Sequence, residues 1–193
     1  MKVLKNIFSK FYLYLLWAMI ATMLWGWIFS FVTNTTPSKK VTVFVNTYAC
    51  SDTDLAVELE KNKPENIKMI KVHPFSFSLF DSSTFVKGDI YIIKSSEIET
   101  YLPSFCPLNE QYRAENPLYE YYYGEDGTAW GIKVYDASTS TGVATEYLTY
   151  TVEGAPQEDY YLFFNADSVH IGALNGSPSD AALTVAENLI GMD

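Results

Sequence analysis

The side chains best suited to acid–base chemistry or metal binding are the two histidines, His73 and His170. An imidazole can act as a general base or ligate a metal, but each role needs partner groups. The histidines lie far apart in the sequence, and the chain has no G-x-S-x-G, H-E-x-x-H, phosphate-binding glycine loop or C-x-x-C motif. We therefore expect no catalytic residue, metal site or cofactor, with His73 at a strand end and His170 half-buried in a strand.

The thiols of Cys50 and Cys106 are the only cysteine side chains. Two cysteines outside the cytoplasm permit one disulfide bond, and each follows a unit whose predicted strand ends are neighbours. Bridging needs Cα atoms within about 7 Å, so the alternative is a pair of reduced, buried thiols. The sequence leaves both alternatives open.

A third group of polar side chains lies in the stretch YYLFFNADSVHIG, from Tyr160 to Gly172, where an apolar run gives way to Asn165, Asp167 and Ser168. Such residues can form the rim of a ligand site or the turn of a hairpin. Because Asn and Asp favour turns, we expect a hairpin in which Ser168 and His170 continue into a second strand.

The tyrosines between Tyr119 and Tyr123 are the remaining residues with binding chemistry. Aromatic faces can stack on sugar rings while the hydroxyl groups form hydrogen bonds. Aromatic residues are also common in strands, which favours a strand with one face packed and the other half-exposed.

The elements that position these residues begin with an uncharged, apolar stretch from Phe11 to Val32. A helix of about 20 apolar residues crosses a bilayer core of about 30 Å. A cleaved signal peptide has a shorter apolar region followed by small residues, whereas this stretch ends in FSFVTNTTP. The sequence therefore predicts a transmembrane helix, with membrane contact through residues 11–32.

The orientation of that helix follows from Lys2, Lys5 and Lys10, which precede it in a tail without acidic residues. Positive charges favour the cytoplasmic side, although Lys39 and Lys40 after the helix weigh against this. We expect a single-pass protein of the cell membrane with a cytoplasmic N-terminus and an extracytoplasmic C-terminal domain.

The remainder of the chain is acidic and rich in apolar residues. The formal net charge is −10 for the whole chain of 193 residues, of which 48% are hydrophobic, and without Lys2, Lys5 and Lys10 the remainder has a net charge of −13. Acidic character disfavours a nucleic-acid partner, and the length fits one domain. We expect a tail and helix over residues 1–33, a linker over 34–40, and an α/β domain over 41–193.

Strands and helices alternate in the first half of this domain. The predicted strands are Val41 to Val45, a segment ending before Pro74, and Asp89 to Ile93; the predicted helices begin near Ser51 or Asp52 and near Ser95 or Ser96. This order predicts a mixed sheet with parallel strands.

The second half begins with a hairpin around Asp126 and Gly127, the strongest short-range hairpin signal in the chain. The segment TEYLTYTV is a further predicted strand. A final helix should be capped by Ser177, start at Pro178 and end at Gly191.

Three segments carry a resemblance to a known family: KVTVFVNTYACSDTDLAVELEKN, GDIYIIKSSEIETYLPSFCPL and YYLFFNADSVHIGALNGSPSDAALTVAENLI. In order and character they resemble the first lobe of the type II periplasmic or extracellular solute-binding proteins of ABC transporters, most of all the sugar-binding branch. The resemblance implies a three-layer α/β fold with a mixed sheet and a ligand cleft at the carboxyl ends of the strands. The positions it implies for ligand binding are Asn46, Tyr48, Ser51 and Asp52 after the first strand, and Ser95 and Ser96 after the third.

Members of that family close two lobes on their ligand, and this domain has room for about one. Two hypotheses follow. The first is a membrane-anchored, non-catalytic domain that binds a small solute or serves an ABC transporter or another membrane protein. The second is an accessory ectodomain that has lost ligand binding and presents its surface to another protein or to a second copy of itself.

Overall fold

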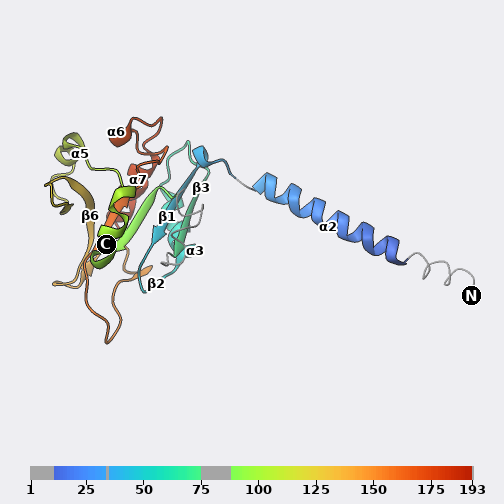
Figure 1. Cartoon of the computed structure of the whole chain (residues 1–193), viewed down its shortest axis with the longest axis horizontal. Helices are drawn as coiled ribbons and strands as arrows, with labels where there is room; N and C mark the ends of the chain where they lie inside the picture. Colours follow the sequence, from blue (N-terminus) through green and yellow to red (C-terminus); the bar gives the residue numbers. More distant parts are fainter. Residues whose placement is uncertain (1–10, 34, 75–87, 193) are drawn as a thin grey trace, which may run out of the picture. The chain divides into compact units, whose positions relative to one another are not determined.

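The computed structural model describes residues 11–33, 35–74 and 88–192 (Figure 1). The chain divides into two compact units, Met1–Thr36 and Pro37–Asp193. The two units are described one after the other.

The first unit contains the helix α2, Phe11–Thr33, of 23 residues. At 1.5 Å per residue the helix is about 34 Å long, which exceeds the roughly 30 Å of a bilayer core. It carries no charged side chain, and the hydroxyl of Thr22 is satisfied by the carbonyl oxygen of Ala18 at 2.7 Å. The helix is thus long and apolar enough to cross a membrane, as the sequence predicts.

The second unit is built on a mixed sheet with the strand order β3-β1-β4-β9-β6-β5, and β7 adds to β6. The strands are β1 Lys40–Val45, β3 Met69–Pro74, β4 Ile90–Lys94, β5 Tyr121–Tyr123, β6 Ala129–Asp136, β7 Thr141–Gly142 and β9 Tyr160–Phe164. Strand β1 is parallel to β3 and β4, with Val43 opposite both Val72 and Ile90. Strand β9 is antiparallel to β4 and to β6. The predicted α/β domain with a mixed sheet is therefore confirmed.

Short helices and one small sheet complete this unit (Figure 1). They are η1 Pro37–Lys39, α3 Asp52–Lys61, η4 Ser95–Glu97, α4 Ile98–Tyr101, η5 Leu102–Ser104, α5 Glu110–Glu115, α6 Gly172–Asn175 and α7 Ala181–Ile190. The small sheet pairs β2, Ala49–Cys50, with β8, Leu148–Thr149.

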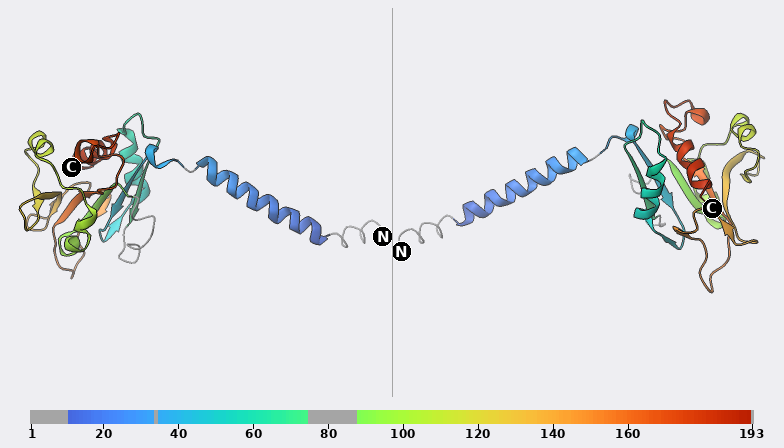
Figure 2. Two further views of the ribbon diagram at one scale, coloured as in Figure 1. Left: turned by 45° about the horizontal axis from the view of Figure 1, so that its top comes forward. Right: turned by 180° about the vertical axis from the view of Figure 1, so that it is seen from behind.

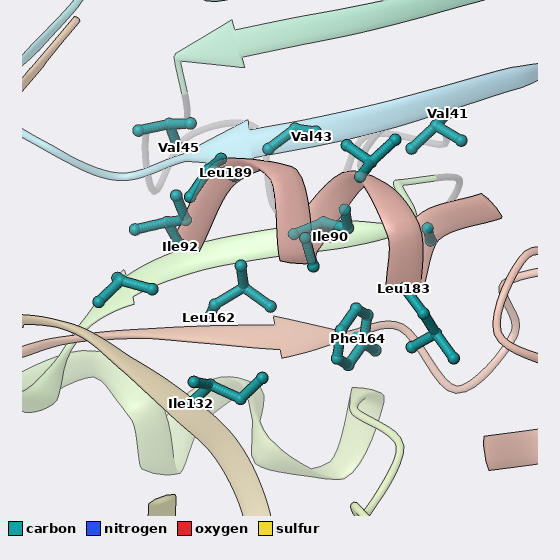
Figure 3. Close-up of a cluster of buried hydrophobic side chains, with 14 of the residues drawn as sticks. Val41, Val43, Val45, Ile90, Ile92, Ile132, Leu162, Phe164, Leu183 and Leu189 are labelled. Atoms are coloured by element: carbon teal, nitrogen blue, oxygen red, sulfur yellow. The ribbon is translucent and has the colours of Figure 1, made fainter. Parts of the chain in front are cut away.

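One face of the large sheet is covered by α3 and α7 (Figure 2). Alternate residues of each strand point to this face, as the two-residue period of a strand requires. Figure 3 shows Val43 of β1, Ile92 of β4 and Leu162 of β9 gathered under α7, where Leu189 is fully buried. Full burial of one such side chain contributes about 1.5–3 kcal/mol.

The other face of the sheet carries aromatic residues, which the segment from η4 to η5 covers. Phe44 stacks on Tyr91, with ring centroids 5.5 Å apart, and Phe105 stacks on Phe163 at 4.6 Å. Helical segments therefore lie on both faces of the sheet.

Local sequence signals placed the hairpin correctly. Strands β5 and β6 are antiparallel, and Gly127 has a φ of +77° at their turn. Asp126 accepts a hydrogen bond from the backbone N–H of Thr128 at 2.9 Å. A left-handed residue of this kind is what Gly tolerates best.

Two other boundaries were predicted wrongly. Helix α7 begins at Ala181 rather than Pro178, because the hydroxyl of Ser177 accepts from the backbone N–H of Ile171 and so closes a turn instead of capping the helix. The strand predicted in TEYLTYTV shrinks to the two residues of β8, because the preceding residues 143–147 form turns.

Candidate functional site

The ligand positions implied by the resemblance lie where β1 and β4 end. The backbone N–H of Asn46 donates to the carbonyl oxygen of Ile92 at 2.8 Å, which holds the two strand ends together. The side-chain amide of Asn46 donates to the carboxylate of Glu97. The structure thus brings Asn46 close to η4, but its side-chain amide already donates a hydrogen bond to Glu97 of the same chain.

The start of η4 is likewise engaged from within the chain. Glu158 accepts from the backbone N–H of Ser96 at 3.0 Å and from the hydroxyl of Ser95 at 3.4 Å. Burial acts to raise the pKa of Glu158, but the hydrogen bonds from Ser96 and Ser95 and the charge of Lys94 together lower it. An internal carboxylate therefore occupies the donors that the resemblance assigned to a ligand.

Of the other three implied positions, Tyr48 lies between β1 and β2, whereas Ser51 and Asp52 follow β2. Helix α3 begins at Asp52, as the sequence predicted, but the chain before it forms β2, which pairs with β8, and the backbone N–H of Ser51 donates to the carbonyl oxygen of Tyr147. The side chain of Ser51 makes no capping hydrogen bond to α3. Asp52 accepts from the N–H of Thr53 at 2.8 Å, and Tyr48 is 43% exposed.

A second polar cluster lies at the opposite edge of the sheet, where β1 and β4 begin and the antiparallel β9 ends. Asp89 accepts from the backbone N–H of Thr42 at 2.8 Å and from the hydroxyl of Ser168 at 2.6 Å. The amide of Asn165 donates to the carbonyl oxygen of Gly88 at 2.8 Å. Asp89, Asn165 and Ser168 are each at least 94% buried. We call these three residues the Asp89 cluster.

The hairpin predicted between Asn165 and Ser168 is wrong. Asn165 pairs with Phe105 in an isolated bridge, and α6 follows instead of a second strand. Residues Asn165 to Ser168 do form a turn, in which the backbone N–H of Ser168 donates to the carbonyl oxygen of Asn165. The side chains of Asn165 and Ser168 also form hydrogen bonds with Gly88 and Asp89 before β4, and α6 rather than a second strand follows the turn. His170 accordingly lies in a turn and not in a strand.

The Asp89 cluster lines a cavity of about 230 Å³. The polar residues around it are Lys40, Asp89, Asn165, Asp167 and Ser168, and Pro37 adds apolar surface. Burial raises the pKa of Asp89, against the opposing effects of its hydrogen bonds with Ser168 and Thr42 and of the charges of His170 and Lys40. Asn165, Asp167 and Ser168 thus all line a cavity, which favours the alternative that they form the rim of a ligand site.

The two histidines hold structural positions. His170 is 1% exposed, and therefore fully buried rather than half-buried as expected, with Nε2 2.9 Å from the carbonyl oxygen of Pro37 and Nδ1 3.3 Å from Ser179 Oγ. Burial and the nearby Lys71 lower the pKa of His73. Within the described ranges no group of three or more His, Cys, Asp or Glu side chains could hold a metal ion.

Both cysteines are free thiols in the structure. Cys50 follows the end of β1, whereas the backbone N–H of Cys106 donates to Phe164, which lies opposite Ile90 at the start of β4. The segment from η4 to η5 therefore carries Cys106 back to the opposite edge of the sheet. Burial raises the pKa of both thiols, that of Cys50 to about 11, which disfavours a nucleophilic thiolate.

The tyrosines of β5 are largely engaged within the fold. The hydroxyl of Tyr122 donates to Glu99 at 2.8 Å, and its ring packs edge-on against Tyr161 at 5.4 Å. The hydroxyl of Tyr121 donates to the carbonyl oxygen of Asn116, while Tyr123 is 51% exposed. These contacts favour the strand interpretation over a sugar-stacking platform.

The residue that sequence reasoning missed is Asp89. A single acid directly before the apolar strand IYII was an available signal, because a carboxylate beside a buried strand needs donors from elsewhere in the fold.

Compared with known proteins, the chain matches no family model, no curated protein and no solved structure. Its function is therefore inferred from its own residues.

Proposed function

We propose that this chain is a single-pass membrane protein whose α/β domain lies outside the cytoplasm and binds a small solute without chemical conversion. The observation that carries the proposal is the cavity of about 230 Å³ lined by the Asp89 cluster. A concave site with a few convergent polar groups is the usual form of a small-molecule site.

The edge of the sheet on which this cavity lies differs from the one implied by the resemblance. The donors at the carboxyl ends of β1 and β4 are engaged by Glu97 and Glu158. At the opposite edge, Asp167 is exposed and Lys40 is half-buried, so charged groups remain accessible around the cavity. This contrast favours the cavity as the binding site.

The membrane orientation is part of the proposal. Lys2, Lys5 and Lys10 precede α2, and the positive-inside tendency puts such a tail in the cytoplasm. The acidic domain would then lie on the outer side, held by α2.

A non-catalytic role is supported by the state of the reactive side chains. The ring nitrogens of His170 are both within hydrogen-bond distance of partners, and burial raises the pKa of both thiols. None of these groups combines the accessibility and the activating partner that a nucleophile or general base needs.

The proposal is tested by thermal unfolding of the full chain in lipid nanodiscs, followed by tryptophan fluorescence, with sugars, amino acids and short peptides. A solute at 100 times its Kd adds about 2.7 kcal/mol to the free energy of unfolding and raises Tm. Val169 lines the cavity and is 40% exposed, so Val169→Trp should fill the cavity and abolish the shift.

The matched control is Val152→Trp, because Val152 is 45% exposed and does not line this cavity. This variant should keep the shift. A shift that survives Val169→Trp would contradict the cavity as the site, and no shift from any solute class on a folded chain would contradict solute binding.

The second candidate is an accessory ectodomain that has lost ligand binding and presents its surface to another protein. The observation that favours it is that Glu97 and Glu158 accept hydrogen bonds from the side-chain amide of Asn46 and the backbone N–H of Ser96 at the carboxyl edge. A folded chain that responds to no solute would favour this candidate.

A further inference from the structure

The cavity beside the Asp89 cluster is lined by charges of both signs. Asp89 and Asp167 supply carboxylates, and Lys40 supplies an ammonium group. Asp89 is 6% exposed, and Asp167 and Lys40 are more accessible. A ligand in this cavity therefore meets one buried carboxylate and two charged groups near solvent.

The carboxylate of Asp89 has hydrogen bonds but no cation in contact. Two neutral groups, the backbone N–H of Thr42 and the hydroxyl of Ser168, donate hydrogen bonds to it. Among the described residues no ion pair within 4.0 Å includes Asp89. A buried carboxylate without a cation is costly, so a ligand that brings a positive group gains binding energy from it.

The ammonium group of Lys40 is similarly without an ion pair in the described part of the chain. Its charge nevertheless acts on Asp89 and opposes the effect of burial on that carboxyl group. Lys40 and Asp89 thus lie within electrostatic range of each other but are not in contact. Because both residues line the cavity, a molecule bound in it can contact both.

The size of the cavity limits that molecule. About 230 Å³ corresponds to roughly seven or eight water volumes of about 30 Å³ each. Pro37 and Val169 add apolar surface that suits a methyl or methylene group. A small molecule with two charged ends and a short carbon skeleton fits this volume and lining.

We propose that the cavity binds a small zwitterion, with its primary ammonium group on Asp89 and Asp167 and its anionic group on Lys40. The inference rests on the proposed solute-binding function and names the class of solute. Two sources carry this chemistry, a free α-amino acid with a short side chain and the phosphoethanolamine headgroup of a lipid. Lipids are relevant because α2 is apolar enough to cross a membrane.

The test is calorimetric titration of the full chain in phosphatidylcholine nanodiscs with four probes: L-alanine, ethylammonium, acetate and glucose. L-Alanine carries both charges, and each of the next two probes carries one. We expect saturable binding of L-alanine, and binding at least about tenfold weaker for ethylammonium, because each lost charged contact is worth about a tenfold change in affinity or more.

The lipid source is tested with nanodiscs that contain phosphatidylethanolamine. If the headgroup occupies the cavity, L-alanine binds more weakly in these discs than in phosphatidylcholine, whose quaternary ammonium group has no N–H to donate. If L-alanine binds with the same affinity in both kinds of nanodisc, the site belongs to a free solute and not to the lipid headgroup.

Substitutions separate the two charged contacts. Lys40→Met and Asp167→Asn should each weaken L-alanine binding about tenfold, and Asp89→Asn should weaken it further. Lys71→Met and Asp54→Asn are the matched controls, because both residues are exposed and neither lines the cavity. Asp89 also accepts hydrogen bonds from Thr42 and Ser168, so the Asp89→Asn variant could fail to fold for structural reasons. In that case the result for Lys40→Met decides the test.

The outcomes distinguish this inference from the proposed function. Glucose could bind in a way that Val169→Trp abolishes but Lys40→Met does not change. That result would overturn the zwitterion inference and keep the proposed solute-binding function. Equal binding of ethylammonium and L-alanine would overturn the role of Lys40. No saturable binding of any probe or of the wider solute panel to a folded chain would overturn both.

Discussion

The hydroxyl of Ser168 donates a 2.6 Å hydrogen bond to the carboxylate of Asp89, from 79 residues further along the chain. This bond joins the start of β4 to the turn that follows β9. The carboxylate also accepts from Thr42 of β1, so one buried side chain holds three segments at the edge of the sheet where the cavity lies.

The pH dependence of stability should report on Asp89. Burial raises its pKa above the ordinary value of 3.8, so the folded state binds this proton more tightly than the unfolded state. The protein should therefore lose stability, relative to the Asp89→Asn variant, as pH rises from about 4 through the raised pKa. Urea unfolding of both chains at several pH values measures this difference, and a difference that is constant with pH would refute the raised pKa.

The packing of α7 on the sheet should dominate the stability of the domain. Leu189 of α7 is fully buried, so Leu189→Ala should lower the free energy of unfolding by about 2–5 kcal/mol. Val57 on α3 is 58% exposed, and Val57→Ala should change it by no more than about 0.5 kcal/mol. Denaturant unfolding of the two variants checks the contrast, and equal losses would argue against the observed position of α7.

A group of charges on β6 should give a salt-dependent contribution. Lys133 lies 3.4 Å from Glu120 and 3.2 Å from both Asp136 and Asp159. Burial acts to lower the pKa of Lys133, but the hydrogen bonds to Asp136 and Asp159 and the charge of Asp159 raise it overall. Removal of the ammonium group leaves three carboxylates close together.

Lys133→Met should therefore lower the free energy of unfolding by about 1–2 kcal/mol at low ionic strength, with a smaller loss at 1 M salt. The control is Lys71→Met, because Lys71 is exposed and forms no ion pair with any described residue. Losses for Lys133→Met that do not depend on salt would point to packing by its aliphatic part instead.

The thiols of Cys50 and Cys106 should both be titratable. Protein purified without a reductant should give two thiols per chain with a chromogenic thiol reagent after denaturation. Reaction of the native protein should be slow, because Cys106 is 6% exposed and burial raises the pKa of Cys50 to about 11. A count of zero thiols under denaturing conditions would reveal a disulfide and contradict the observed separation of the two residues.

Local sequence signals were sufficient for much of the fold. The β-branched run at Val41 to Val45, the Asp126-Gly127 turn and the apolar positions of the last helix each encode their element in consecutive residues. The sequence did not predict the placement of β9, because an apolar run does not indicate which strand it pairs with or in which direction. Its antiparallel position beside β4 is what carries Asn165 and Ser168 to the edge where β1 begins.

In the candidate site, too, the local features were predictable from the sequence and the nonlocal contacts were not. The parallel pairing of β1 and β4 brings Asn46 and Ser96 to one edge, as a βαβ-like order implies. That Glu158 occupies the N–H of Ser96 could not be foreseen, because the two residues are 62 positions apart and no local pattern links them. The contact between Asp89 and Ser168 is equally nonlocal, and it became visible only with the fold.

The most direct test of solute binding in the cavity is a calorimetric titration of L-alanine into the full chain and into its Val169→Trp variant, both in phosphatidylcholine nanodiscs. We predict saturable binding to the unsubstituted chain and binding at least about tenfold weaker to the variant, because the indole fills the cavity beside Asp89. Equal affinity for the two chains, or no saturable binding of L-alanine or of any sugar, amino acid or peptide to the folded protein, would contradict it.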